Sequence, residues 1–167
     1  MLLKLSLALV LLIMGIQDFK YRAISWYWFP GLAVLLILSN PDFELYSCLF
    51  NIGFIALIYV LLTLWFSIKN RRVIHLHQEH LGIGDVLFLI SISVYFSPLS
   101  FFAFYLFSLV LITIGTGMYL LLMKPAQLTI PLAGLQGIAL LVVLATCWLL
   151  KLDSSTIDFL THLKGAI

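Results

Sequence analysis

Two acidic residues stand where a long apolar run meets the loop beside it, and their type and placement suit catalysis. Asp18 closes the first apolar run, and Asp85 opens a later one within Gly82-Ile83-Gly84-Asp85. A carboxylate deep in a membrane costs about 2.5 to 3.5 kcal/mol, so an acid placed there is a candidate for function. As a pair, one carboxylate could take a proton from water while the other, protonated, polarises a peptide carbonyl.

Each acid also has a purely structural interpretation. Asp85 could be an ordinary helix cap after a glycine-containing turn. Asp18 could be an interfacial residue paired with Lys20 or Arg22. The glycines favour a site, because residues without a Cβ allow close backbone approach and leave the start of a helix easy to deform around an extended substrate.

The composition places these acids in a membrane protein. Of the 167 residues, 63% are hydrophobic and only 10% are charged, whereas a soluble domain carries about 25% charged residues. The 14% of aromatic residues likewise excludes a disordered chain. The net charge of +2 makes nucleic acid an improbable partner.

Long unbroken apolar runs predict an all-α polytopic membrane protein with about six transmembrane helices, because a helix needs about 20 apolar residues to cross a bilayer. Residues 1–150 form the predicted membrane domain, and residues 151–167 form a short tail that could include an interfacial helix. The second and fourth helices are short and could begin inside the membrane. The expected helices cover residues 2–22, 25–40, 45–68, 83–97, 100–123 and 130–150.

The number of spans puts the two acids on one side of the membrane. Two predicted helices lie between Asp18 and Asp85, and an even number of crossings returns the chain to the side it left. With both termini outside, six Lys and Arg residues fall on the cytoplasmic side and three on the outer side, which satisfies the positive-inside rule. The acids are therefore expected to face the cytoplasm, with Trp26, Tyr27 and Trp28 at the inner interface.

Three passages resemble the type IV prepilin peptidases and preflagellin peptidases, which are membrane aspartic proteases with a GxGD motif. The segment from Asp18 through Lys20 and Arg22 to Ile24 looks like the first family motif, and Gly82-Ile83-Gly84-Asp85 matches the second. The segment Ile130-Pro131-Leu132-Ala133-Gly134 is similar to the Pro-containing start of a late helix in the family.

The resemblance implies a catalytic pair, Asp18 and Asp85, in an aspartic endopeptidase that removes the short basic leader of a membrane-inserted, prepilin-like substrate at the cytoplasmic boundary. Substrate-binding or site-shaping roles are expected for a further group of motif residues. These are Gly82, Gly84, Lys20, Arg22 and Pro131. No cofactor or metal is expected.

The chain departs from the family in three ways. Ser25 follows Ile24 where proline is frequent, and Leu87 stands where many members have lysine. The cysteine-rich insertion of larger, N-methylating members is also missing. We therefore expect cleavage without methyltransferase activity.

Two other groups of residues have less definite interpretations. His75, His77 and His80 crowd the loop before Gly82, where a solvated loop is the simpler interpretation and a metal site the alternative. Cys48 and Cys147 form no CxxC motif and are expected to be two buried thiols, although a disulfide between them is geometrically possible.

Two other functions remain open for the chain. Paired membrane acids also serve as proton relays in proton-coupled carriers, although both acids here lie near one interface. A non-catalytic subunit of a pilus or secretion assembly would use the acids only as caps.

Overall fold

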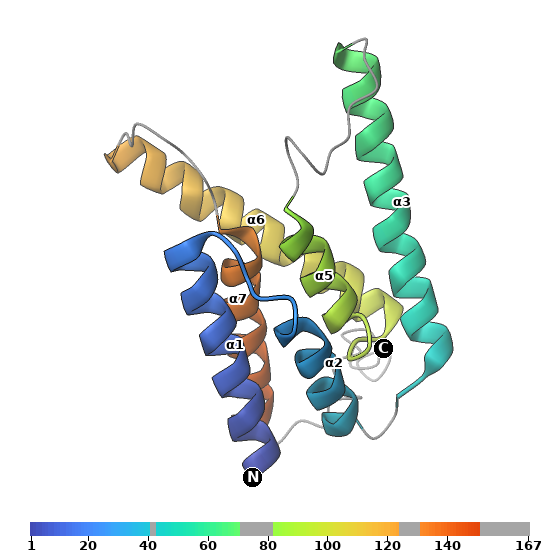
Figure 1. Ribbon diagram of the computed structural model, residues 1–167, viewed down its shortest axis with the longest axis vertical. Coiled ribbons are helices and arrows are strands. Elements are labelled where there is room, and N and C mark those ends of the chain that lie inside the picture. The colour runs from blue at the N-terminus through green and yellow to red at the C-terminus, as the bar shows by residue number, and fades with distance from the viewer. Residues whose placement is uncertain (41–42, 71–81, 124–130, 151–167) are drawn as a thin grey trace, which may run out of the picture.

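The computed structural model describes residues 1–40, 43–70, 82–123 and 131–150, and every element in these ranges is an α-helix (Figure 1). The protein is an all-α polytopic membrane protein, as predicted. The helices are α1 (Leu2–Tyr21), α2 (Trp28–Ser39), α3 (Leu45–Asn70), α5 (Ile83–Ile92), α6 (Pro98–Met123) and α7 (Leu132–Leu150).

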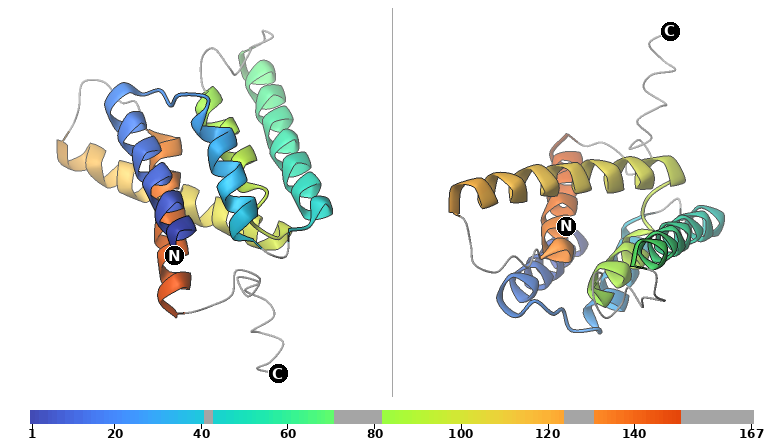
Figure 2. Two further views of the ribbon diagram at one scale, coloured as in Figure 1. Left: turned by 60° about the horizontal axis from the view of Figure 1, so that its bottom comes forward. Right: turned by 90° about the horizontal axis from the view of Figure 1, so that it is seen from above.

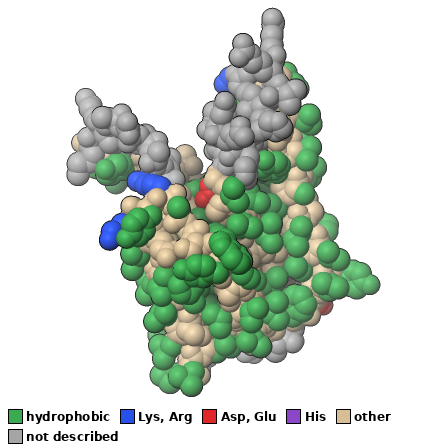
Figure 3. Space-filling model, viewed as in Figure 1, with side chains coloured by type: hydrophobic (Ala, Val, Ile, Leu, Met, Phe, Trp, Pro, Cys, Tyr) green, Lys and Arg blue, Asp and Glu red, His purple; other side chains and the backbone are tan. Residues whose placement is uncertain are grey.

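Four of the described helices, α1, α3, α6 and α7, are long and apolar enough to cross a membrane. The other two, α2 and α5, have 12 and 10 residues and are therefore about 18 and 15 Å long. Large apolar side chains stay exposed on the outer faces, and hydrophobic atoms cover most of the face in Figure 3. Such a surface is typical of a protein surrounded by lipid.

The helices pack around α5 and α7. Helix α1 lies along α7 and α2, while α2 and α3 both contact α5 and α6 crosses α7 obliquely (Figure 2). Side chains spaced one helical turn apart fill the interior, because residues at i and i+4 share one face of a helix. Leu7, Leu11, Leu32, Leu36, Phe88, Ile92, Leu140 and Leu144 are all buried.

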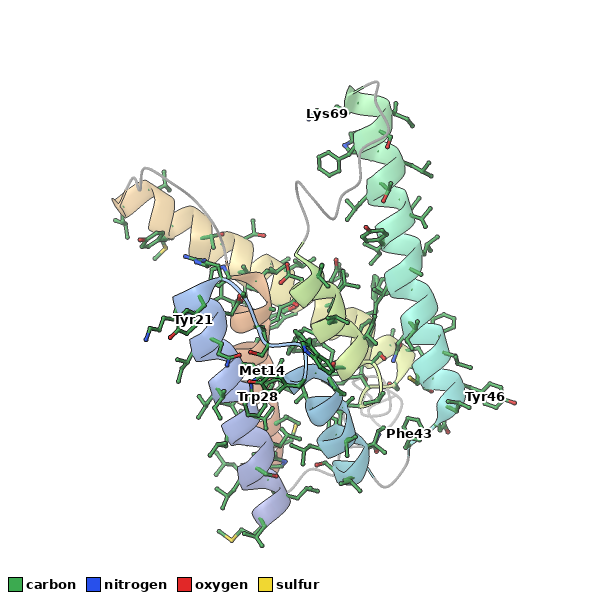
Figure 4. All side chains as sticks on the ribbon, viewed as in Figure 1. Met14, Tyr21, Trp28, Phe43, Tyr46 and Lys69 are labelled. Atoms are coloured by element: carbon green, nitrogen blue, oxygen red, sulfur yellow. The ribbon has the colours of Figure 1, made fainter. Side chains whose placement is uncertain are left out.

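Helix α2 begins three residues later than predicted, because the preceding connection runs back along α1. The backbone N–H of Ser25 donates a hydrogen bond to Gln17 Oε1 (3.3 Å). As a result α2 starts at Trp28, which packs against the same buried cluster as Met14, and Figure 4 shows both residues near the middle of the bundle.

Helix α5 ends at Ile92, whereas the sequence predicted a helix to residue 97. Asn51 of α3 explains the early end. Its Nδ2 donates hydrogen bonds to the carbonyls of Ser93 (2.9 Å) and Phe96 (2.8 Å), which stabilises a turn in place of another helical turn.

The two cysteines are free thiols, as expected. Cys48 and Cys147 are both buried, and the Sγ of Cys48 lies 3.7 Å from Ser93 Oγ. The protein therefore has no disulfide between them.

Candidate active site

Asp18 lies in the last turn of α1 and is buried, with 8% of its surface exposed. Its Oδ2 accepts a hydrogen bond from the backbone N–H of Gly134, with 2.6 Å between the two heavy atoms. A buried carboxylate needs such a partner, because an unpaired charge away from water is strongly unfavourable.

Asp85 lies in the first turn of α5, but Gly82 occupies the cap position of that helix. The Oδ1 of Asp85 accepts a hydrogen bond from the backbone N–H of Ala133 at 2.9 Å. The carboxylate also interacts with the backbone N–H of Gly82, so it caps the start of α5 and at the same time binds a second helix.

The two acids meet at the N-terminus of α7, since Ala133 and Gly134 are consecutive residues. The first turn of a helix has N–H groups without intrahelical partners and carries the positive end of the helix dipole, so it stabilises negative charge. Bond lengths alone limit the separation of the bonded carboxyl oxygens to about 10 Å. The predicted convergence of the two acids is therefore present in the fold.

Glycine is required where α7 meets Asp18. A Cβ on Gly134 would lie 2.9 Å from Asp18 Oδ2 and 3.0 Å from Asp18 Cβ, which is too close for any side chain without movement. The buried backbone of Gly134 can therefore approach the carboxylate only because this residue has no Cβ.

The two glycines of the GxGD motif differ in their surroundings. A Cβ on Gly82 would stand 3.2 Å from Asp85 Oδ2, a tight contact with the carboxylate itself. A Cβ on Gly84 would meet only the ring of Phe29 at 3.8 Å, an ordinary van der Waals distance. The structure thus places Gly82, rather than Gly84, against the acid.

The two basic residues after Asp18 also differ. Arg22 caps α1 in the left-handed conformation (φ 54°), its backbone N–H donates to the Asp18 carbonyl at 3.0 Å, and its charge acts on the Asp18 carboxylate. Lys20 extends over the ring of Tyr21, with its Nζ 5.1 Å from the ring centroid. Of these two basic residues, Arg22 is the one whose charge acts on the Asp18 carboxylate.

Pro131 immediately precedes α7, and its carbonyl accepts the N–H of Leu135 at 3.1 Å. Proline suits this place because it has no N–H to leave unpaired at the start of a helix. It therefore helps to set where α7 begins, and hence where the N–H groups of Ala133 and Gly134 lie.

The sequence reasoning noted Ala133 and Gly134 only as part of a motif and overlooked Gln136. The sequence did contain a signal for Gln136, because it is an amide side chain in a predominantly apolar helix. A polar side chain in a membrane helix is energetically unfavourable and is therefore a candidate for function. His75, His77 and His80 lie outside the described residues, as does the tail at 151–167.

The fold and the paired acids define a helical membrane protein with a two-carboxylate site. Residues 5–117 match the sequence model of the type IV leader peptidase family. The match covers more than half of the chain, and the protein belongs to this family of peptidases. No curated protein and no solved structure matches the chain.

Proposed function

We propose that the protein is a membrane aspartic endopeptidase that removes the short basic leader of prepilin-like substrates. Membership of the type IV leader peptidase family supports the class of substrate. The observation that carries the proposed mechanism is the pairing of Asp18 and Asp85 with successive N–H groups of α7.

The two carboxyl groups have complementary tasks in this mechanism. Each uses one oxygen in its bond to α7, and its second oxygen can bind water or substrate. One carboxylate takes a proton from water as the water oxygen attacks the peptide carbonyl, whose oxygen receives a proton from the other acid. The first acid then gives the proton that it took from water to the departing nitrogen as the C–N bond breaks. As the carbonyl re-forms, a hydroxyl of the tetrahedral intermediate returns a proton to the second acid.

We place the reaction at the cytoplasmic boundary of the inner or plasma membrane, with both termini outside. The excess of Lys and Arg in the connections on the side of the two acids supports this orientation. In Figure 3, basic (blue) and acidic (red) side chains lie near each other in the upper part of the view. The proposal covers cleavage and not N-methylation.

The direct test is co-expression with precursors that carry a short basic leader before an apolar helix, scored for loss of the leader. The unmodified protein should cleave at least one precursor, and Asp18→Asn and Asp85→Asn should each abolish cleavage. Glu44→Gln is a matched control, because this exposed acid bonds Ser47 and lies on the connection to α3, away from the pair.

Membrane insertion of each variant is measured alongside cleavage. Full processing by either inserted Asn variant would overturn the proposal. That result would show that cleavage does not depend on the substituted acid.

A further inference from the structure

A cavity of about 40 Å³ lies beside Asp85, between α3, α5, α6 and α7. Its walls are almost entirely apolar and aromatic, and include Tyr59 of α3, Leu89 of α5 and Tyr105 of α6. Asp85 and Gln136 are the charged and amide side chains that line it. The cavity therefore begins at the proposed catalytic carboxylate and continues into an apolar space.

Gln136 is fully buried on α7, three residues after Ala133, whose N–H binds Asp85. Neither its Nε2 nor its Oε1 has a hydrogen-bond partner among the residues that the structure describes. A buried amide in this condition is costly, since each unmet polar atom loses its bonds to water. A bound ligand could supply the hydrogen bonds that the Gln136 amide lacks and so offset this cost.

We propose that this cavity is a substrate subsite, in which Gln136 binds the backbone of the substrate next to the scissile bond and the apolar wall holds a neighbouring apolar side chain. The proposal rests on the function proposed above. It assigns Gln136 as a binding residue of the same site.

The chemistry of the substrate matches that of the cavity. The scissile bond lies where the basic leader meets the apolar helix, and the peptide groups around it must be released from any helical hydrogen bonds before Asp85 can act on the bond. In a poorly hydrated site the released groups need new partners. A glutamine amide offers one acceptor and two donors, and so can bind both the N–H and the C=O of an extended segment.

The first test measures the cleavage kinetics of the purified protein with the precursor that it processes. Gln136→Leu should raise KM about tenfold, the cost of a lost hydrogen bond of ordinary strength, with kcat little changed. Gln136→Met should raise KM by a similar factor, because methionine also lacks the amide. Thr146→Val is the control, because this exposed residue of α7 does not line the cavity and should keep the original KM.

Thermal unfolding in detergent separates binding from a structural role. The midpoint of Gln136→Leu should equal or exceed that of the original protein, because the substitution removes an unsatisfied amide. A lower midpoint with an unchanged KM would show that Gln136 serves only the fold, and would overturn the proposal.

A cross-linking test does not depend on catalysis. In an Asp18→Asn background, Tyr59→p-benzoylphenylalanine should cross-link to the precursor on illumination, whereas the same change at Leu57, an exposed residue of α3 outside the cavity, should not. Cross-linking to lipid alone would show that lipid, and not the precursor, occupies the cavity, and would overturn the proposal. If the unmodified protein cleaves precursors but Gln136→Leu keeps its KM, only the subsite fails; without any cleavage, the proposed function fails.

Discussion

Asp18 Oδ2 and the backbone nitrogen of Gly134 lie 2.6 Å apart, although 116 positions separate the two residues in the chain. This hydrogen bond ties the end of α1 to the start of α7. A second bond, from Ala133 to Asp85, ties the same turn of α7 to α5. One short piece of backbone thus sets the positions of both acids.

Gly134→Ala should lower kcat by about 100-fold, because the new Cβ would force Asp18 from its present position and a 1 Å displacement of a catalytic group costs roughly this much. Cleavage kinetics of the inserted variant provide the measurement. Gly137→Ala is the control on the same helix, since its Cβ would meet only Phe88 at 3.8 Å. Equal activities for the two variants would contradict the role given to Gly134.

Gly82→Ala should reduce kcat more than Gly84→Ala does. The first substitution would place a Cβ 3.2 Å from the carboxylate of Asp85, while the second would meet the Phe29 ring at 3.8 Å. We expect about a tenfold loss for Gly82→Ala if the acid shifts by a fraction of an ångström. The reverse order would show that Gly84 acts through a contact with substrate instead.

Arg22→Gly should be more stable than Arg22→Ala by about 1 kcal/mol, because glycine adopts the left-handed conformation without the steric cost that a Cβ imposes. Equilibrium unfolding in detergent measures the difference. Both variants lose the charge near Asp18, so any change in cleavage that they share reports on that charge and not on the backbone. Equal stabilities would mean that the bend after α1 is not strained.

Asn51→Leu should lower the free energy of unfolding by about 2 kcal/mol, since the carbonyls of Ser93 and Phe96 would lose their donor. Ser47→Ala, on the same helix, should have little effect, because Ser47 bonds the exposed Glu44. Unfolding measurements compare the two. Similar values would indicate that the turn after α5 is held by packing alone.

The sequence was sufficient to predict the helices, because apolar runs depend only on composition and order, and span parity correctly predicted that the two acids lie at the same end of the helix bundle. It could not predict which backbone groups the acids bind, since Ala133 and Gly134 carry no side-chain polarity to reveal the contact. The end of α5 was missed for a similar reason. It depends on Asn51, which lies more than 40 positions away and belongs to another helix.

Helix α7 lies wholly beyond residue 117, where the match to the family ends. The region by which the family is recognised therefore contains both acids but not the peptide groups that hold them. A truncated chain ending at residue 117 would keep the signature of a leader peptidase and lose the support on which its chemistry depends. Transplanting the two acid motifs into another membrane scaffold would fail for the same reason, unless a third helix end came with them.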